Sequence, residues 1–114
     1  MNIVSIKATN MNLTDAIRNY VADKCSALDK LAQDFEPAAE IAIEVGKSTR
    51  HHNKGPYMRC EMNLTIPGTI LRAEEEREDL YEAIDVAQSE LKRQLVEHKD
   101  RLIDKNRGPR PGKE

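Results

Sequence analysis

The sequence is poor in the residues that build aromatic sites and membrane spans. Among its 114 residues there is no tryptophan, one phenylalanine and three tyrosines, so aromatic residues make up 4% of the chain. The core must therefore be aliphatic, and few rings are available to stack against unpaired bases. No run of 18 apolar residues occurs, and the first ten residues lack the apolar stretch of a signal peptide. We therefore expect a cytoplasmic protein that enters no membrane.

Cysteine and histidine occur without the spacing of metal or catalytic sites. Cys25 and Cys60 are isolated, which predicts two free buried thiols in a reducing compartment. His51 and His52 are adjacent, so an extended backbone turns them to opposite sides, and no further ligands stand at zinc spacing. His98 lies on an apolar helical stripe and is expected at the edge of the core. Since no nucleophile elbow, phosphate loop or zinc-protease motif occurs either, we expect no metal, no cofactor and no enzymatic activity.

The charges are segregated along the chain. The formal net charge of −2 by itself argues against nucleic-acid binding. However, residues 74–90 contain eight acids and one base, whereas residues 92–113 contain eight bases and three acids. An approaching polyanion meets the local potential and not the total charge. The C-terminal segment is therefore basic enough to suit a nucleic acid.

Hydrophobic periodicity predicts six elements in the order β-α-β-β-β-α. We expect strands over 2–8, 40–47, 57–66 and 69–73, and helices over 15–35 and 81–105. Thr14 is the expected N-cap of the first helix, and Pro67-Gly68 fits a tight turn between the last two strands. The acids between 74 and 79 suit the positive N-terminal end of the second helix.

This order predicts an α+β fold. A right-handed crossover makes the first two strands parallel, so the four-stranded sheet is mixed. Because the alternation leaves one sheet face polar, both helices are expected to pack side by side on the other face. We assign residues 1–105 to this domain and residues 106–114 to a basic, Gly/Pro-rich tail that we expect to be disordered.

Basic side chains of the two predicted helices are the candidate RNA-binding residues. If the helices pack side by side, both sets border one surface, and lysine and arginine are sufficient to hold RNA phosphates. The competing interpretation is that they are ordinary solvated residues, and the same applies to the basic loop at 47–56. The candidates are Arg18, Lys24 and Lys30 in the first helix, and Lys92, Arg93, Lys99, Arg101 and Lys105 in the second.

Both helices also carry a pattern found in a known family. The second has Tyr81, Ala83-Ile84-Asp85, Leu91, Arg93-Gln94-Leu95 and His98-Lys99-Asp100; the first has Leu13-Thr14, Ala16-Ile17-Arg18, Tyr20-Val21, Lys24, Leu28 and Lys30. Together these patterns resemble the ribosome hibernation promoting factors, small bacterial ribosome-associated translation inhibitors. The resemblance covers most of residues 1–105.

The resemblance implies a β-α-β-β-β-α protein that binds the small ribosomal subunit across the channel for mRNA and tRNA, and silences translation by occupying it. Basic side chains would contact ribosomal RNA, with neighbouring ribosomal proteins as further partners. The matching positions are Arg18, Lys24, Lys30, Arg93, Lys99 and Arg101. The chain resembles the short members, which act alone or with a separate ribosome modulation factor, and we expect a monomer away from the ribosome.

Two positions depart from the family pattern. Glu90 and Glu97 stand where members often carry lysine, on the same flank as Arg101 and near Arg93. The RNA face is therefore expected to be less basic than in those members. Two other functions stay open. One is a general module for folded RNA of the double-stranded-RNA-domain type. The other is a small metabolic enzyme that uses the histidine-bearing loop.

Overall fold

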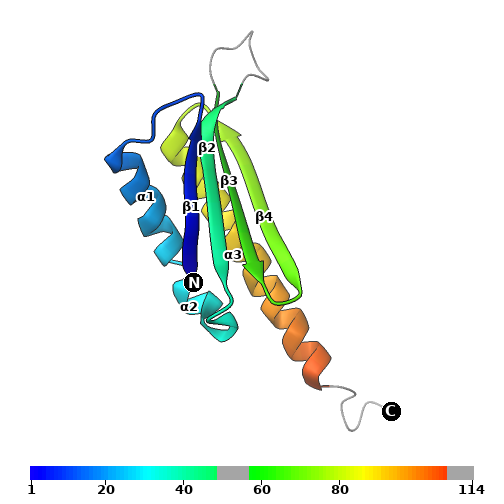
Figure 1. Ribbon diagram of the computed structural model, residues 1–114. Coiled ribbons are helices and arrows are strands. Elements are labelled where there is room, and N and C mark those ends of the chain that lie inside the picture. The colour runs from blue at the N-terminus through cyan, green and yellow to red at the C-terminus, as the bar shows by residue number, and fades with distance from the viewer. Residues whose placement is uncertain (49–56, 108–114) are drawn as a thin grey trace.

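The structure is a computed structural model and describes residues 1–48 and 57–107. Its elements are β1 (Asn2–Thr9), α1 (Asp15–Ser26), α2 (Asp29–Ala32), the short helix η1 (Gln33–Phe35), β2 (Glu40–Ser48), β3 (Tyr57–Ile66), β4 (Thr69–Arg77) and α3 (Leu80–Arg107). The strands lie in the order β1-β2-β3-β4, with β1 parallel to β2 and the other neighbours antiparallel (Figure 1). The predicted mixed sheet of four strands is confirmed.

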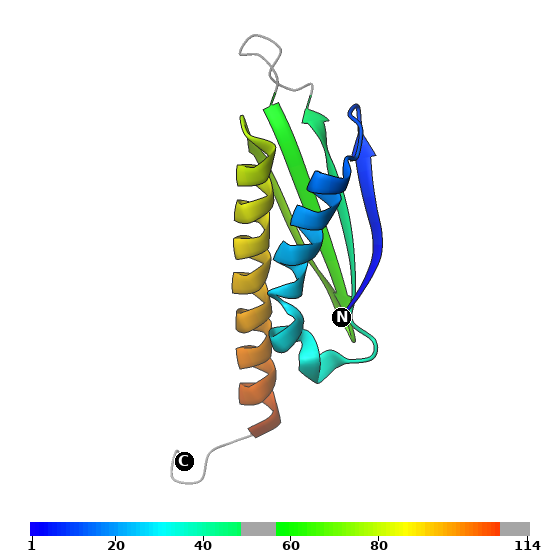
Figure 2. The ribbon, with the colours of Figure 1, turned by 90° about the vertical axis from the view of Figure 1, so that its left-hand side faces the viewer.

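The core lies between one face of the sheet and the helices α1 and α3, which cover that face side by side (Figure 2). Strand alternation decides which side chains enter it, since Ile41, Ile43 and Val45 of β2 are buried while Glu40 is exposed. The fully or almost fully buried stripe of α3 consists of Leu80, Ile84, Ala87, Leu91 and Leu95. Cys25 and Cys60 are free and buried as predicted, and burial raises the pKa of both thiols to about 12.

The first helical segment is interrupted, so the prediction of one helix over 15–35 is wrong. The hydroxyl of Ser26 donates to the carbonyl of Asp23 at 2.7 Å, where it competes with the backbone donors of the last turn. The N–H of Leu28 then bonds to the carbonyl of Cys25 at 2.9 Å and closes α1. This turn buries Leu28 completely, and α2 and η1 continue in a different direction (Figure 2).

The last strand is longer than predicted. It was expected to end at Ala73, but β4 continues to Arg77, so Glu74 and Glu76 pair with β3 and do not lie at the start of a helix. An exposed strand with successive carboxylates would repel itself, but here Arg59 of β3 lies beside Glu74. Opposite charges on neighbouring strands stabilise a sheet, and this pairing keeps the acidic segment extended.

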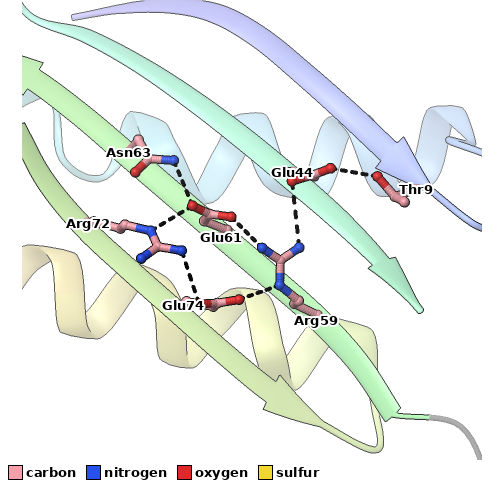
Figure 3. A network of polar contacts seen from close by, with 7 residues as sticks. All are labelled: Thr9, Glu44, Arg59, Glu61, Asn63, Arg72 and Glu74. Carbon is pink, nitrogen blue, oxygen red and sulfur yellow. Dashed lines mark hydrogen bonds and ion pairs between the residues drawn. The ribbon is translucent and has the colours of Figure 1, made fainter. Parts of the chain in front are cut away.

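A network of ion pairs and hydrogen bonds covers the sheet face that the helices leave open. It joins side chains from all four strands: Thr9, Glu44, Arg59, Glu61, Asn63, Arg72 and Glu74 (Figure 3). Arg72 lies 2.7 Å from Glu61 and 3.2 Å from Glu74, and the hydrogen bond from Arg72 holds the pKa of Glu61 below its usual value. The charges on this face are therefore largely compensated within the protein.

Local backbone requirements explain two glycines and a cap. Gly68 has φ of +85°, which the predicted turn after Pro67 requires. Gly46 lies so close to β1 that a Cβ atom there would come within 2.4 Å of the carbonyl oxygen of Thr9. Thr14 caps α1 as predicted, because its hydroxyl accepts the N–H of Ile17 at 3.1 Å.

Two predicted features lie outside the described residues. They are the basic loop tip with Arg50, His51, His52 and Lys54, and residues 108–114 of the tail; α3 itself passes the expected boundary at 105 and ends at Arg107. Across residues 1–48 and 57–107, no helix is long and apolar enough to span a membrane. In the same residues, no three His, Cys, Asp or Glu side chains are grouped as metal ligands.

Candidate nucleic-acid interface

A polar contact joins α1 to α3 near the start of α3. The hydroxyl of Tyr20 donates to Asp85 Oδ1 at 2.6 Å, and Lys24 Nζ lies 3.1 Å from the same oxygen. Lys24 Nζ also lies 5.6 Å from the centre of the Tyr20 ring, which meets the edge of Tyr81 with the centroids 4.7 Å apart. The hydrogen bond from Tyr20, followed by Lys24, holds the pKa of Asp85 below its usual value. Lys24 is therefore occupied in joining the two helices.

A second cation joins the far half of α3 to α2 and η1. Lys99 Nζ donates to the backbone carbonyl of Leu31 at 3.0 Å and lies 3.2 Å from the carboxylate of Asp34. Its side chain is only 22% exposed. Because this ammonium satisfies a carbonyl at the end of a short helix, Lys99 holds that part of the chain against α3. The structure thus gives Lys99 an internal partner, in addition to the RNA contact that the sequence predicted.

Lys92 lies between these two contacts. Asp85, Lys92 and Lys99 are spaced seven residues apart, which places them on one flank of α3. Asp85 contacts α1 and Lys99 contacts α2, whereas Lys92 is exposed and forms no ion pair with another described residue. We call this flank, together with the facing side chains of α1 and α2, the helical seam. The seam offers an unpaired cation near its middle.

The opposite flank of α3 carries a chain of ion pairs. Arg93 bonds to Glu90 through Nε at 3.0 Å and Nη2 at 2.7 Å, and its Nη1 bonds to Glu97. Glu97 also lies 3.2 Å from Arg101, and Gln94 donates to Glu90 at 3.0 Å. The hydrogen bonds from Arg93, followed by Gln94, lower the pKa of Glu90 to about 2. Arg93 and Arg101, both predicted to contact RNA, are thus already matched with carboxylates of their own helix.

The eight predicted cations therefore divide into occupied and unpaired ones. The unpaired cations are exposed and have no ion pair with another described residue: Arg18, Lys30, Lys92 and Lys105. Lys30 lies on α2, and Lys105 lies in the last turn of α3. Figure 2 shows that this end of α3 extends beyond the sheet. At 100° per residue, Arg18 falls on the side of α1 away from Tyr20 and Lys24, so it does not join the seam.

The sequence contained only part of the signal for this arrangement. Tyr20 and Lys24 are four residues apart on one helix, which predicts that the two side chains meet. Nothing in the local sequence shows that Asp85, 65 residues away, accepts from Tyr20, or that Leu31 supplies a carbonyl to Lys99. These partners can be identified only from the packing of the helices in the structure.

The fold and this surface define a class of protein. It is a small α+β domain whose helical layer presents lysines to the solvent, while its open sheet face is compensated by internal ion pairs. Lysines without an internal partner are the side chains that pair with the phosphates of an anionic backbone.

Comparison with known sequences identifies the family. Residues 4–103 match the family described as Sigma 54 modulation protein / S30EA ribosomal protein, and the chain belongs to this family. The ribosome hibernation promotion factor of Deinococcus radiodurans is 33% identical over 97% of the chain and 56% of the relative. The ribosome hibernation promoting factor of Azotobacter vinelandii is 32% identical over 95% of the chain and 92% of the relative. The chain thus spans about half of the Deinococcus protein and most of the Azotobacter protein.

Solved structures agree with the family. The crystal structure of the N-terminal domain of Thermus thermophilus Protein Y superposes with a TM-score of 0.70 at 31% identity, covering 86% of this chain and 99% of that domain. A ribosomal subunit interface protein from Coxiella burnetii, with a TM-score of 0.66 at 20% identity, shows the same fold. The resemblance seen in the two helices is confirmed. The family consists of ribosome-associated proteins that are not enzymes, which supports the expectation of a binding function.

Proposed function

We propose that this protein is a ribosome hibernation factor that binds the small ribosomal subunit across the channel for mRNA and tRNA and inhibits translation by occupying that channel. The observation that carries the proposal is the helical seam with its unpaired Lys92, in a chain whose relatives are named ribosome hibernation factors. Occupation of a channel needs a rigid domain and an adhesive surface, and it needs no catalytic group.

The contacts to ribosomal RNA come first from the unpaired cations. Lys30, Lys92 and Lys105 are free to exchange counterions for phosphates, and Arg18 adds a contact at the periphery. Lys24 and Lys99 act mainly by keeping α1 and α2 in place against α3. Arg93 and Arg101 contact RNA only where a phosphate replaces one of their carboxylate partners. The sequence predicted an RNA contact for all eight residues alike, whereas the structure gives four of them internal partners.

The charge on the two faces of the domain supports this orientation. On the open sheet face, Arg59 and Arg72 are surrounded by Glu44, Glu61 and Glu74, so little positive potential is left for a polyanion. Among the described residues, the open sheet face adds Lys7, which lies beside Glu44 and Glu61, whereas the helical layer carries Arg18, Lys30, Lys92 and Lys105 without ion pairs. The helices therefore face the RNA, and residues 1–105 form the binding domain.

The cellular setting follows from the same proposal. A factor that binds ribosomes acts in the cytoplasm. The open sheet face, whose charges are largely neutralised by ion pairs within the domain, does not need a second copy of the chain to cover it. We therefore propose that it is a monomer away from the ribosome. It acts either alone or together with a separate ribosome modulation factor.

Co-sedimentation with purified small and large ribosomal subunits tests the proposal. We expect binding to small subunits that weakens with salt and is displaced when mRNA and tRNA occupy the channel. Lys92→Gln should weaken binding and reduce the slope of log affinity against log salt by about 0.7 to 0.9, as for one lost phosphate contact. Lys7→Gln is the matched control, because Lys7 is exposed beside Glu44 and Glu61 on the open sheet face and has no ion pair with another described residue.

Two results would contradict the proposal. Binding to small subunits that survives saturating mRNA and tRNA would place the protein outside the channel. Equal affinity for free duplex RNA and for small subunits would instead indicate a general module for folded RNA.

A further inference from the structure

A small apolar pocket lies at the basic end of the seam. Its lining residues are Asp34, Phe35, Lys99, Leu102 and Ile103, and its volume is about 200 Å³. The pocket therefore lies between η1 and the last turns of α3, beside the contact that Lys99 makes with the Leu31 carbonyl. Ile103 is 49% exposed, so one wall is open to an incoming group.

Phe35 is the aromatic wall of this pocket, and its position is set by the core. The ring is partly buried against the core and meets the ring of His98 with the centroids 6.0 Å apart and the planes tilted by 42°. An aromatic ring held in this way loses little conformational freedom when a second flat ring stacks on it. Phe35 is also the only phenylalanine of the chain.

The charges around the pocket indicate which kind of molecule enters it. Tyr81, an exposed aromatic residue beside the seam, follows Glu78 and Asp79 and precedes Glu82, so phosphates are repelled there. The pocket at Phe35 instead adjoins the half of α3 in which residues 92–107 contain six bases and three acids, with Lys92 and Lys105 unpaired among the described residues. Stacking rings beside cations are how proteins hold unpaired bases of a nucleic acid.

The polar rim of the pocket adds a preference. Lys99 Nζ lies 3.2 Å from Asp34 Oδ2, and this carboxylate stands at the rim of the pocket. The side chain of Asp34 is 73% exposed, so Oδ1 is accessible as a hydrogen-bond acceptor. A carboxylate oxygen accepts from the exocyclic amino group of adenine, cytosine or guanine, which uracil lacks.

We propose that this pocket takes one unpaired base of ribosomal RNA, stacked on Phe35, with a preference for a base that carries an amino group. The inference rests on the proposed function, because it deepens the contact of the helical layer with RNA. It adds a contact that recognises a base to a surface whose other contacts recognise phosphates.

Photo-crosslinking tests the occupant directly. A benzophenone amino acid at position 103 of the full chain is irradiated on the small subunit, and the products are mapped on RNA and on ribosomal proteins. We expect crosslinks to an unpaired nucleotide. Crosslinks to a ribosomal protein alone, or to paired nucleotides alone, would overturn the inference.

Affinity measurements give the second arm. Phe35→Leu removes the stacking ring and keeps an apolar side chain, and Ile103→Ser opens the exposed wall without touching the core. We expect each to weaken binding about tenfold with an unchanged salt slope, since stacking involves no counterions, and Phe35→Tyr to retain binding. Ile70→Ser is the control, because Ile70 is 63% exposed on β4 and does not line the pocket.

The two hypotheses fail in different ways. If Phe35→Leu and Ile103→Ser both bind small subunits as the wild type does, and mRNA and tRNA still displace the protein, the base pocket is refuted and the proposed function stands. If the unaltered protein does not bind small subunits, the proposed function itself is refuted, and the inference with it.

Discussion

The ion-pair chain on α3 allows a test of how far Glu90 and Glu97 weaken RNA binding by occupying Arg93 and Arg101. Arg93 bonds to Glu90 and Glu97, and Arg101 lies 3.2 Å from Glu97. The double change Glu90→Gln with Glu97→Gln removes both carboxylates at nearly constant shape and leaves both arginines unpaired. Because the pKa of Glu90 is about 2, this carboxylate stays ionised throughout the physiological pH range, and mild acid cannot produce the same release.

The size of the effect follows from counting phosphate contacts. Each arginine that gains an RNA phosphate steepens the slope of log affinity against log salt by about 0.7 to 0.9. We therefore expect the double variant to have a slope steeper by about 0.7 if one arginine reaches RNA, and by about 1.8 at most if both do. Binding should be tighter at low salt and approach that of the wild type at high salt. Because exposed pairs of this kind contribute little to folding, we expect Tm to stay within about 2 °C.

Sedimentation with small subunits over a salt series measures this slope. The matched variant is Glu78→Gln with Glu82→Gln, which changes the net charge equally near the start of α3. Neither acid has an ion pair with another described residue, so this change relieves repulsion there but releases no cation for a phosphate. Lysine at 90 and 97 should enlarge the effect, since it adds two further cations. An unchanged slope in the glutamine variant, or weaker binding by the lysine variant at every salt concentration, would mean that this flank does not face RNA.

Four further predictions concern stability and reactivity. Lys99→Met should lower Tm in calorimetry, because it releases the carbonyl of Leu31, and a Tm equal to that of the wild type would remove its structural role. The pKa of Asp85 is lower in the folded protein than in the unfolded chain. The stability that Asp85 contributes is therefore present above its unfolded pKa and is lost as pH falls through its folded pKa. We expect Asp85→Asn to lose less stability than the wild type on acid titration. Gly46→Ala should reduce the free energy of unfolding in urea by about 1 to 3 kcal/mol through its clash with β1, whereas a loss under about 0.5 kcal/mol would show that β1 shifts freely. With a pKa raised to about 12 by burial, Cys60 should resist a thiol reagent at pH 8 until the chain unfolds, and rapid labelling of the native protein would contradict this.

The elements themselves were predictable because each depends on periodicity within its own stretch. Met62 and Leu64 alternate with Glu61 and Asn63, and α3 repeats its apolar residues at helical spacing, so strand and helix follow from neighbouring residues alone. Errors occurred where a distant or competing group intervened. At the end of α1, the hydroxyl of Ser26 bonds to the backbone of Asp23. In the extra length of β4, Glu74 forms ion pairs with Arg59 of β3 and Arg72 of β4.

The candidate site shows the same division more sharply. The resemblance in the two helices identified a family of ribosome-associated proteins and a helical layer with many cations, and the comparisons confirmed the family. Which cation is free cannot be read from residue type, because Lys92 and Lys99 have the same side chain and lie on the same flank. Lys99 finds the Leu31 carbonyl, and Lys92 finds no partner among the described residues.

The sequence by itself determined the order of elements, the buried face of each and the family, because these depend on local periodicity and on a pattern carried by single helices. The tertiary structure decided which lysines and arginines remain without an ion pair among the described residues. The physical reason is that an ion pair requires two groups within about 4 Å, and for Lys24 with Asp85, as for Lys99 with Asp34, only the packing of separate helices brings the groups that close.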